Sequence, residues 1–303
     1  MHGISSSPGK VVLLHALLIA LASVALCGSH QQPAIEYGAI TGDRWIHVVA
    51  AGETWGTIGA RVGMTPAVLA TRNQRTVRTP VRPGDVLAID NRHVAPPYER
   101  DELVVNLPQR MLFHYWGGAL RRQYPVAIGR PDWQTPTGRF SIAVLETDPT
   151  WDVPLSIQDE MRRAGRPVLK KVAPGGGNPL GRYWIGLTLG SVGVHGTNSP
   201  ASIYQFATHG CIRLHPEDVD DLFAYVAIGD PGRLVYEPVL VGYDGTDVYL
   251  EVHADVYRRG VNLRARAWQL LDATGLRELV DPEQVERALR DAEGLAVPVT
   301  DTR

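Results

Sequence analysis

The chain opens with a run that is almost wholly apolar, from Val11 to Cys27, behind the basic residue Lys10. A positive residue, an apolar stretch and small residues near its end are typical of a secretory signal peptide, which we assign to residues 1–29. An uncleaved anchor is the alternative, because the 17 residues of this run almost suffice to span a bilayer. A lipid anchor on Cys27 is disfavoured by the bulky Leu26 that precedes it.

Residues 44–90 follow the order strand, helix, helix, strand. Thr54 is the expected N-cap of a first helix, whose apolar residues recur at helical spacing until Gly63 stops it. Thr65 is the N-cap of a second helix, with Pro66 in its first turn. The flanking strands are expected over His47–Val49 and Val86–Ile89.

Residues 101–240 alternate apolar and polar positions between Gly- and Pro-rich turns, which predicts a mostly β domain. Pro216–Val226 is expected to be a helix packed on it, because its apolar residues share one face. Residues 146–180 are polar and rich in Gly and Pro, which favours a functional loop with a short helix over Ser156–Ala164. The expected strands are Leu103–Asn106, Met111–Trp116, Gln123–Ile128, Arg139–Val144, Tyr183–Leu187, Val192–His195 and Arg233–Val239.

Shorter segments flank this β domain on both sides. Residues 91–100 contain two consecutive prolines and predict a stiff polar linker. Residues 241–303 hold a strand, Val248–Val252, and helical patterns over Asn262–Ala273 and Glu283–Glu293. We find no catalytic pattern in them and expect a small α/β appendage that covers an edge of the β domain or shapes its cleft.

Charge and cysteine content narrow the class of protein. Lys+Arg 30 against Asp+Glu 32 gives a formal net charge of −2, which leaves no basic surplus for binding nucleic acid. The two cysteines are Cys27 in the apolar leader and Cys211, so an intramolecular disulfide is not expected. A lone thiol in an oxidising compartment is a liability unless it is buried or useful.

The residues around Cys211 favour a reactive thiol over an inert one. A free thiol ionises near pH ~8.5, so a nucleophilic cysteine needs a base or a nearby positive charge. In an extended segment, His209 and Arg213 lie two residues on either side of Cys211 and share its face. Arg213 can stabilise a thiolate or a substrate carboxylate, and Gly210 lets the backbone approach a substrate closely.

Four histidines are candidates for the general base: His195, His209, His215 and His253. His195 ends a predicted strand and is followed by Gly196, which crowds nothing. His209 is too close in sequence to turn easily onto its neighbour Cys211. The residues alone therefore favour His195 over His209 without excluding either.

Four motifs in chain order resemble the catalytic domain of L,D-transpeptidases of the YkuD type. They are Thr135 to Phe140, Pro174 with Asn178 to Gly181, Val194 to Asn198, and Thr208 to Leu214. The resemblance implies a β-sandwich fold, with Cys211 as nucleophile and His195 as base. It also implies an oxyanion hole in the backbone around the nucleophile and a supporting set made of Thr208, His209, Gly210, Arg213 and Gly196.

Two positions depart from that pattern. Thr208 replaces the more usual serine, and we expect its hydroxyl to keep the same hydrogen bond. Tyr204 stands where glycine is common, and we expect its bulk to narrow the cleft and alter the acceptor.

Residues 44–90 resemble a second family, the LysM domain, through the run His47 to Trp55, Asn73, and the turn Pro83-Gly84-Asp85 with Val86-Leu87. This family binds glycans that contain N-acetylglucosamine, so the resemblance implies a sugar groove near Gly52, Glu53 and Thr54. Trp55 replaces a smaller aliphatic residue and is expected in the core. A degenerate module that only spaces the chain is the alternative.

Together these features predict a periplasmic, wall-associated transferase without a metal or organic cofactor. Its partners would be peptidoglycan stem peptides and glycan strands, and it would form 3–3 crosslinks, or attach an outer-membrane lipoprotein, through a thioester on Cys211. An L,D-carboxypeptidase or a wall amide hydrolase could use the same site. A non-catalytic peptidoglycan-binding protein is the remaining alternative.

Overall fold

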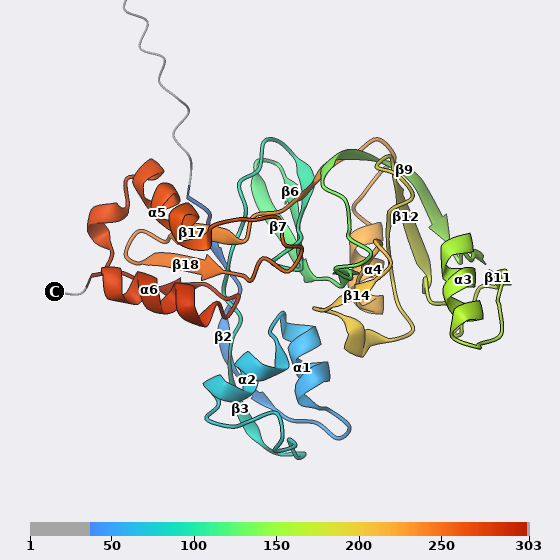
Figure 1. Cartoon of the computed structure of the whole chain (residues 1–303), viewed down its shortest axis with the longest axis horizontal. Helices are drawn as coiled ribbons and strands as arrows, with labels where there is room; N and C mark the ends of the chain where they lie inside the picture. Colours follow the sequence, from blue (N-terminus) through green and yellow to red (C-terminus); the bar gives the residue numbers. More distant parts are fainter. Residues whose placement is uncertain (1–36, 302–303) are drawn as a thin grey trace, which may run out of the picture. The chain divides into compact units, whose positions relative to one another are not determined.

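A computed structural model describes residues 37–301, so the predicted leader over residues 1–29, with Cys27, lies outside the described residues. These residues form one compact unit. Strands dominate this unit and helices are few, which confirms the prediction of a mainly β protein (Figure 1). Within residues 37–301, no helix has the length and apolar character that crossing a membrane requires.

The central element is one continuous sheet of eight strands in the order β15-β13-β12-β9-β16-β5-β6-β7. It curls around a hydrophobic core, which helix α4 (Pro216–Phe223) completes through Val219 and Leu222. The strands in chain order are β5 (Glu102–Asn106), β6 (Met111–Trp116), β7 (Ala119–Pro125), β9 (Gly138–Thr147), β12 (Tyr183–Leu187), β13 (Gly193–His195), β15 (Ile212–Arg213) and β16 (Pro231–Val235).

The long strand β9 explains why one sheet is present where a β-sandwich predicts two. Its first residues, Gly138 to Ser141, pair with β16, and its last residues, Ile142 to Thr147, pair with β12. One strand therefore belongs to both halves and joins them into one sheet, with a shift in register at Gly186 and Leu187 of β12. Strands β6 and β12 have the predicted bounds, while the strand predicted over Gln123–Ile128 is divided between β7 and the short β8 (Ile128–Gly129).

The N-terminal module has the predicted order β2 (Arg44–Val48), α1 (Trp55–Val62), α2 (Pro66–Arg72) and β3 (Val86–Asp90). The Thr54 side chain accepts the N–H of Thr57, and Gly63 ends α1 in the left-handed region at φ 72°. Trp55 is buried in the core of this module, as predicted, and its Nε1 donates to the Thr79 carbonyl at 2.8 Å.

The segment 91–100 differs from the predicted polar linker. It contains β4 (His93–Val94), which pairs with β1 (Ile40–Thr41), and both β4 residues are fully buried. Nδ1 of His93 lies 2.8 Å from Glu251 in the C-terminal region, and its Nε2 lies 3.2 Å from the Gly63 carbonyl. The two prolines did not indicate this burial, because hydrogen bonds to three distant parts of the chain fix the segment.

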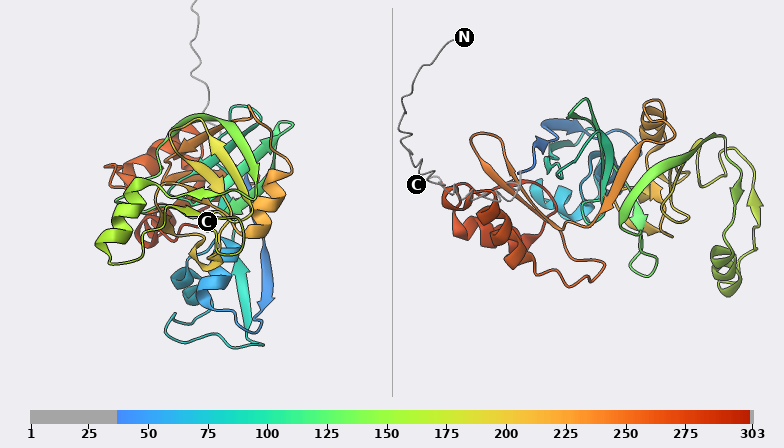
Figure 2. Two further views of the ribbon diagram at one scale, coloured as in Figure 1. Left: turned by 90° about the vertical axis from the view of Figure 1, so that its right-hand side faces the viewer. Right: turned by 90° about the horizontal axis from the view of Figure 1, so that it is seen from above.

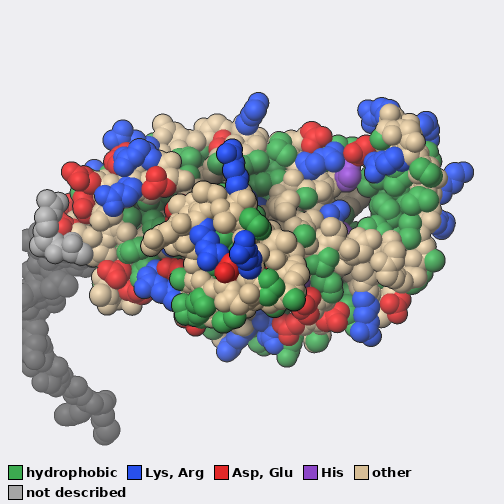
Figure 3. Space-filling view, turned by 90° about the horizontal axis from the view of Figure 1, so that it is seen from below, with side chains coloured by type: hydrophobic (Ala, Val, Ile, Leu, Met, Phe, Trp, Pro, Cys, Tyr) green, Lys and Arg blue, Asp and Glu red, His purple; other side chains and the backbone are tan. Residues whose placement is uncertain are grey.

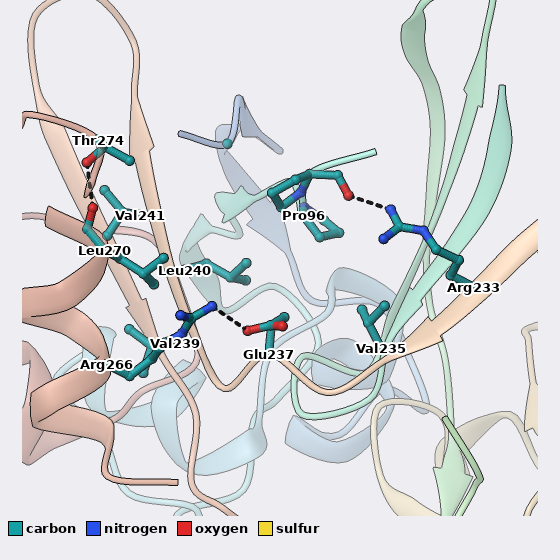
Figure 4. Close-up of a pocket in the computed structure, with 12 residues that line it drawn as sticks. Pro96, Arg233, Val235, Glu237, Val239, Leu240, Val241, Arg266, Leu270 and Thr274 are labelled. Atoms are coloured by element: carbon teal, nitrogen blue, oxygen red, sulfur yellow. Dashed lines mark hydrogen bonds and ion pairs between the residues drawn. The ribbon is translucent and has the colours of Figure 1, made fainter. Parts of the chain in front are cut away.

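The C-terminal region is the predicted small α/β unit. Strands β17 (Val239–Tyr243), β18 (Val248–Val252) and β19 (Val297–Pro298) form a sheet, on which α5 (Leu263–Ala273) and α6 (Pro282–Asp291) pack (Figure 1). A cavity of about 170 Å³ lies where this unit leaves β16, and an ion pair of 3.2 Å between Arg266 and Glu237 crosses its rim (Figure 4).

The predicted functional loop over residues 146–180 is an extension at the far end of β9. It holds the strand pair β10 (Trp151–Asp152) and β11 (Lys171–Val172) with helix α3 (Leu155–Arg163) between them. Figure 2 shows this extension projecting from the sheet. The short helix predicted over Ser156–Ala164 is therefore present, shifted by one residue.

Candidate active site

Two adjacent strands bring the predicted catalytic residues together. Strands β13 and β15 pair in parallel, with Val194 opposite Ile212 and His195 opposite Arg213. By this register Cys211, which directly precedes β15, lies beside Gly193, two positions before His195 on β13. Alternate residues of a strand share one face, so Cys211 and His195 lie on the same face of neighbouring strands.

His195, Cys211, Thr208, His209 and Arg213 all line one cavity of about 500 Å³. Its opposite wall comes from the extension that carries α3, and the surface is hollowed beside a group of hydrophobic side chains toward the right-hand end of Figure 3. The remaining residues predicted to support catalysis, Gly196 and Gly210, are the chain neighbours of His195 and Cys211. Other lining residues include Trp133, Trp151, Ile157, Glu160, Met161 and Ser191.

The His195 imidazole is buried and held in one orientation. Its Nδ1 lies 2.7 Å from the Gly196 carbonyl, and its ring stacks on Trp184 of β12 with centroids 5.8 Å apart. A Cβ at Gly193 would come within 2.3 Å of that indole, so the stacking requires glycine there. Burial lowers the pKa of His195 to about 4, with Arg213 acting in the same direction and the Gly196 and Leu180 carbonyls in the opposite one.

The Cys211 thiol is partly exposed to the cavity, and its Sγ lies 4.0 Å from the Ser191 carbonyl. Burial raises the pKa of this thiol above its ordinary value, while the Gly193 backbone and Arg213 favour the thiolate. A high thiol pKa beside a low imidazole pKa leaves both groups uncharged at neutral pH. These pKa shifts favour proton transfer from the thiol to the imidazole during the reaction over a standing ion pair.

Hydroxyl groups hold the loop between Thr208 and Cys211. Thr208 Oγ1 donates to the Cys211 carbonyl at 2.6 Å and accepts the Gly210 N–H at 3.1 Å. Thr135, in the first of the four motifs, donates to the Gly210 carbonyl at 2.9 Å. Gly210 has φ 111°, where a side chain would strain the backbone. The hydroxyl that threonine shares with serine thus makes two hydrogen bonds in this loop.

Arg213 reaches the cavity from β15 and is partly buried. Its Nη1 lies 3.5 Å from the Ser202 hydroxyl, and its buried Nε has no hydrogen-bond partner within residues 37–301. An unpaired guanidinium donor is costly to bury, so it is suited to an anionic group that enters the cavity.

The sequence did not single out Glu160, which faces His209 across the cavity. Nε2 of His209 lies 2.5 Å from Glu160 Oε2, and the Trp133 ring meets the imidazole edge-on with centroids 4.7 Å apart. Glu160 belongs to α3, in the stretch predicted to be a functional loop. The only available signal was that location, because nothing in the sequence places α3 beside residue 209.

Tyr204 does not narrow the cleft as expected. Its side chain is buried away from the cavity, with the Arg110 guanidinium 4.2 Å from its ring and the Gly294 carbonyl 3.4 Å from its hydroxyl. Its backbone has φ 60°, which explains why glycine suits this position. The departure therefore affects packing against the C-terminal region.

The predicted glycan-binding residues lie in the turn before α1 and are not among those lining the cavity of Cys211. Gly52 has φ 86° with open space around it. The Glu53 carboxylate lies 2.7 Å from Nε2 of His47 and accepts the Ala50 N–H at 2.8 Å. The Thr54 hydroxyl caps α1, so two of the three side chains also fix the turn itself.

Comparisons with known proteins point to one family. The model of the YkuD family, the L,D-transpeptidase catalytic domain, matches residues 100–241. The protein named "Probable L,D-transpeptidase YbiS" of Escherichia coli (strain K12) is 32% identical over 175 residues, which are 56% of this chain and 56% of that protein. "Probable L,D-transpeptidase ErfK/SrfK" of Salmonella typhimurium is 27% identical over 228 residues, 72% of this chain and 73% of that protein.

Among solved structures, an L,D-transpeptidase from Mycobacterium smegmatis is similar with 25% identity and a TM-score of 0.35, covering 44% of this chain and 57% of that one. The chain spans about half the length of the first curated relatives it matches. Residues 100–241 thus match the L,D-transpeptidase catalytic domain of the YkuD family, in agreement with the predicted class of enzyme.

Proposed function

We propose that this protein is an exported L,D-transpeptidase that forms 3–3 crosslinks between peptidoglycan stem peptides through a thioester on Cys211. The observation that carries the proposal is the single cavity that contains Cys211, His195 and Arg213 within a domain matching the YkuD family. The predicted leader and the glycan-binding module are consistent with a periplasmic, wall-associated enzyme. Neither the leader nor the module's ligand is needed for the chemistry that follows.

In the first half-reaction, His195 takes the proton from Cys211 Sγ, and the thiolate attacks the carbonyl carbon of the L,D peptide bond before a terminal D-alanine. The bond to the D-alanine nitrogen breaks, the imidazolium returns the proton to that amine, and a thioester remains on Sγ. The negative oxygen formed in between needs N–H donors. Because the Gly210 N–H is held by Thr208, we assign the donor role chiefly to the Cys211 N–H, with Gly210 shaping the loop.

In the second half-reaction, the amine of another stem peptide attacks the thioester carbonyl. His195 accepts its proton and returns it to the departing sulfur, which regenerates the neutral thiol. The free guanidinium donors of Arg213 are suited to a carboxylate of either stem peptide. If water or a lipoprotein lysine entered instead, the same steps would give a carboxypeptidase or a protein attachment.

The direct test is incubation of the purified protein with a disaccharide-tetrapeptide, with the products read by mass spectrometry. We expect a crosslinked dimer that lacks one D-alanine, and its absence with Cys211→Ala. Tripeptide without dimer would show a hydrolase. Unchanged activity of Cys211→Ala would refute the assignment of the nucleophile.

We also propose that residues 44–90 are a LysM module that binds N-acetylglucosamine-containing glycan near Gly52, Glu53 and Thr54. Support comes from the β2-α1-α2-β3 order and from the exposed turn before α1. The Cys211→Ala protein should sediment with insoluble peptidoglycan, and chitin oligomers should compete, whereas cello-oligomers without acetamido groups should not. Sedimentation unaffected by chitin oligomers would point to a module that only spaces the chain.

A further inference from the structure

Helix α3 is connected to the nucleophile's loop by one short side-chain contact. Oε2 of Glu160 lies 2.5 Å from Nε2 of His209, and both side chains line the cavity that contains Cys211. Strands of the sheet do not otherwise hold α3, because the helix projects on the extension between β10 and β11. None of its residues is fully buried, so few apolar contacts fix its position.

The contact is reinforced from the other side of the carboxylate. Nη1 of Arg130 lies 3.5 Å from Glu160 Oε1, and Arg130 is oriented by Asp132 at 3.1 Å. The bond to His209 lowers the pKa of Glu160, with Arg130 acting in the same direction, which keeps the carboxylate ionised. Glu160 thus joins α3 to two segments of the catalytic domain.

The position of His209 gives this contact a consequence for catalysis. His209 is separated from Cys211 by Gly210 alone, and hydrogen bonds from Thr208 and Thr135 already hold the backbone between them. The His209 imidazole is held by Glu160 and packs against Trp133. These contacts restrain the backbone of His209, at the start of the segment that leads to Cys211. The same contact keeps Ile157 and Met161 at the wall of the cavity.

We propose that Glu160 is a positioning residue: through His209 it holds α3 at the cavity and fixes the backbone that receives the negative oxygen during acyl transfer. This inference rests on the proposed function, and it adds a residue that the four motifs do not contain. The proposed role of Glu160 predicts different effects of its loss on two reactions of the Cys211 thiol. Acyl transfer needs the N–H donors of this backbone, whereas alkylation of Cys211 by iodoacetamide forms no oxyanion and needs only the thiolate.

The test compares Glu160→Ala, Glu160→Gln and the control Asp159→Asn, which removes one negative charge from the same helix outside the cavity. Glu160→Ala should lower kcat on the disaccharide-tetrapeptide about tenfold, the size of a 1.4 kcal/mol loss, and leave the alkylation rate of Cys211 within about twofold. Glu160→Gln can still accept a hydrogen bond and should recover part of kcat, while Asp159→Asn should behave as the wild type. An unchanged kcat for Glu160→Ala, or a parallel fall in alkylation, would overturn the proposal.

A second measurement does not depend on turnover. Trypsin can cleave the extension after Arg162, Arg163, Lys170 and Lys171. Glu160→Ala should speed cleavage there severalfold compared with wild type and Asp159→Asn, because α3 loses its contact with His209. Equal cleavage rates would refute the role of Glu160, whereas a wild type without activity on stem peptides would count against the proposed function alone.

Discussion

At the scale of single residues, the site contains a neutral thiol and a neutral imidazole. Burial disfavours the charged form of each, which raises the pKa of Cys211 and lowers that of His195 to about 4. Arg213 favours the thiolate but disfavours the imidazolium. Because oxidants attack the thiolate, the protonated form of Cys211 is the less susceptible to oxidation.

This charge state predicts the pH dependence of alkylation. The rate of Cys211 modification by iodoacetamide should rise with pH and reach its midpoint above that of an ordinary free thiol, because only the thiolate reacts. Mass spectrometry of the Cys211 peptide measures the rate, and the guanidinium-unfolded chain is the control with an ordinary thiol. A midpoint below pH 7 would show instead a standing thiolate–imidazolium pair.

At the scale of elements, the C-terminal region supports the catalytic loop. Tyr257, which follows β18, donates to the Gly129 carbonyl at 2.7 Å and accepts the Thr135 N–H at 3.3 Å. Thr135 in turn donates to the Gly210 carbonyl at 2.9 Å. We expected the appendage to cover an edge of the β domain or to shape its cleft. A chain of hydrogen bonds from Tyr257 through Thr135 to Gly210, the residue before the nucleophile, gives it a way to shape the cleft.

Tyr257→Phe tests this path. Removal of one buried hydroxyl should lower the free energy of unfolding by about 1 kcal/mol and reduce kcat severalfold, because Thr135 is less firmly held. Denaturant unfolding and turnover are the measurements. Tyr243→Phe is the matched control, since its hydroxyl donates to the exposed Gly245 carbonyl far from the loop; equal losses in the two variants would contradict the path.

At the scale of the whole described chain, one buried polar cluster joins regions that the sequence separated. Glu251 of β18 lies 2.8 Å from both His93 and His253 and accepts the Val94 N–H at 2.6 Å. Burial opposes its ionisation, but the two imidazoles outweigh it and lower the pKa of Glu251 to about 2. Together with the His93 contact to Gly63, the cluster connects the N-terminal module, the segment 91–100 and the C-terminal unit.

The cluster predicts a loss of stability in acid. Burial lowers the pKa of His253 below 6.5, so the folded state resists a proton that the unfolded state binds, and stability falls as pH drops below 6.5. Glu251 stabilises the folded state above pH 4.5, and that contribution is lost as pH falls toward 2. Both groups act in the same direction, and denaturant unfolding across this range measures their effect.

Glu251→Gln isolates the carboxylate. At pH 7 it should lower the free energy of unfolding by about 1.5–3 kcal/mol, the scale of hydrogen bonds to a charged group. Its stability should also vary less than that of the wild type between pH 4.5 and 2. Glu278→Gln, at an exposed position, is the control, and equal stability of the two variants would show that the cluster contributes nothing.

The sequence by itself determined the local features of this protein. Helix caps at Thr54 and Thr65, strands such as β6 and β12, and the four motifs around Cys211 are encoded in short stretches of residues whose physical preferences act locally. The favoured pair of Cys211 and His195 followed from the same stretches, and the structure places both on one cavity.

Only the tertiary structure decided which distant residues meet. The continuous sheet depends on the offset pairing of β9, the burial of segment 91–100 depends on Glu251, and the partner of His209 is Glu160 on a separate helix. Each of these contacts joins residues about fifty or more positions apart, or whole strands, so no local pattern could reveal it. The reactive residues Cys211 and His195 could be predicted because they lie in short motifs. The residues that hold them, such as Glu160, are brought there by long-range contacts that exist only once the chain is folded.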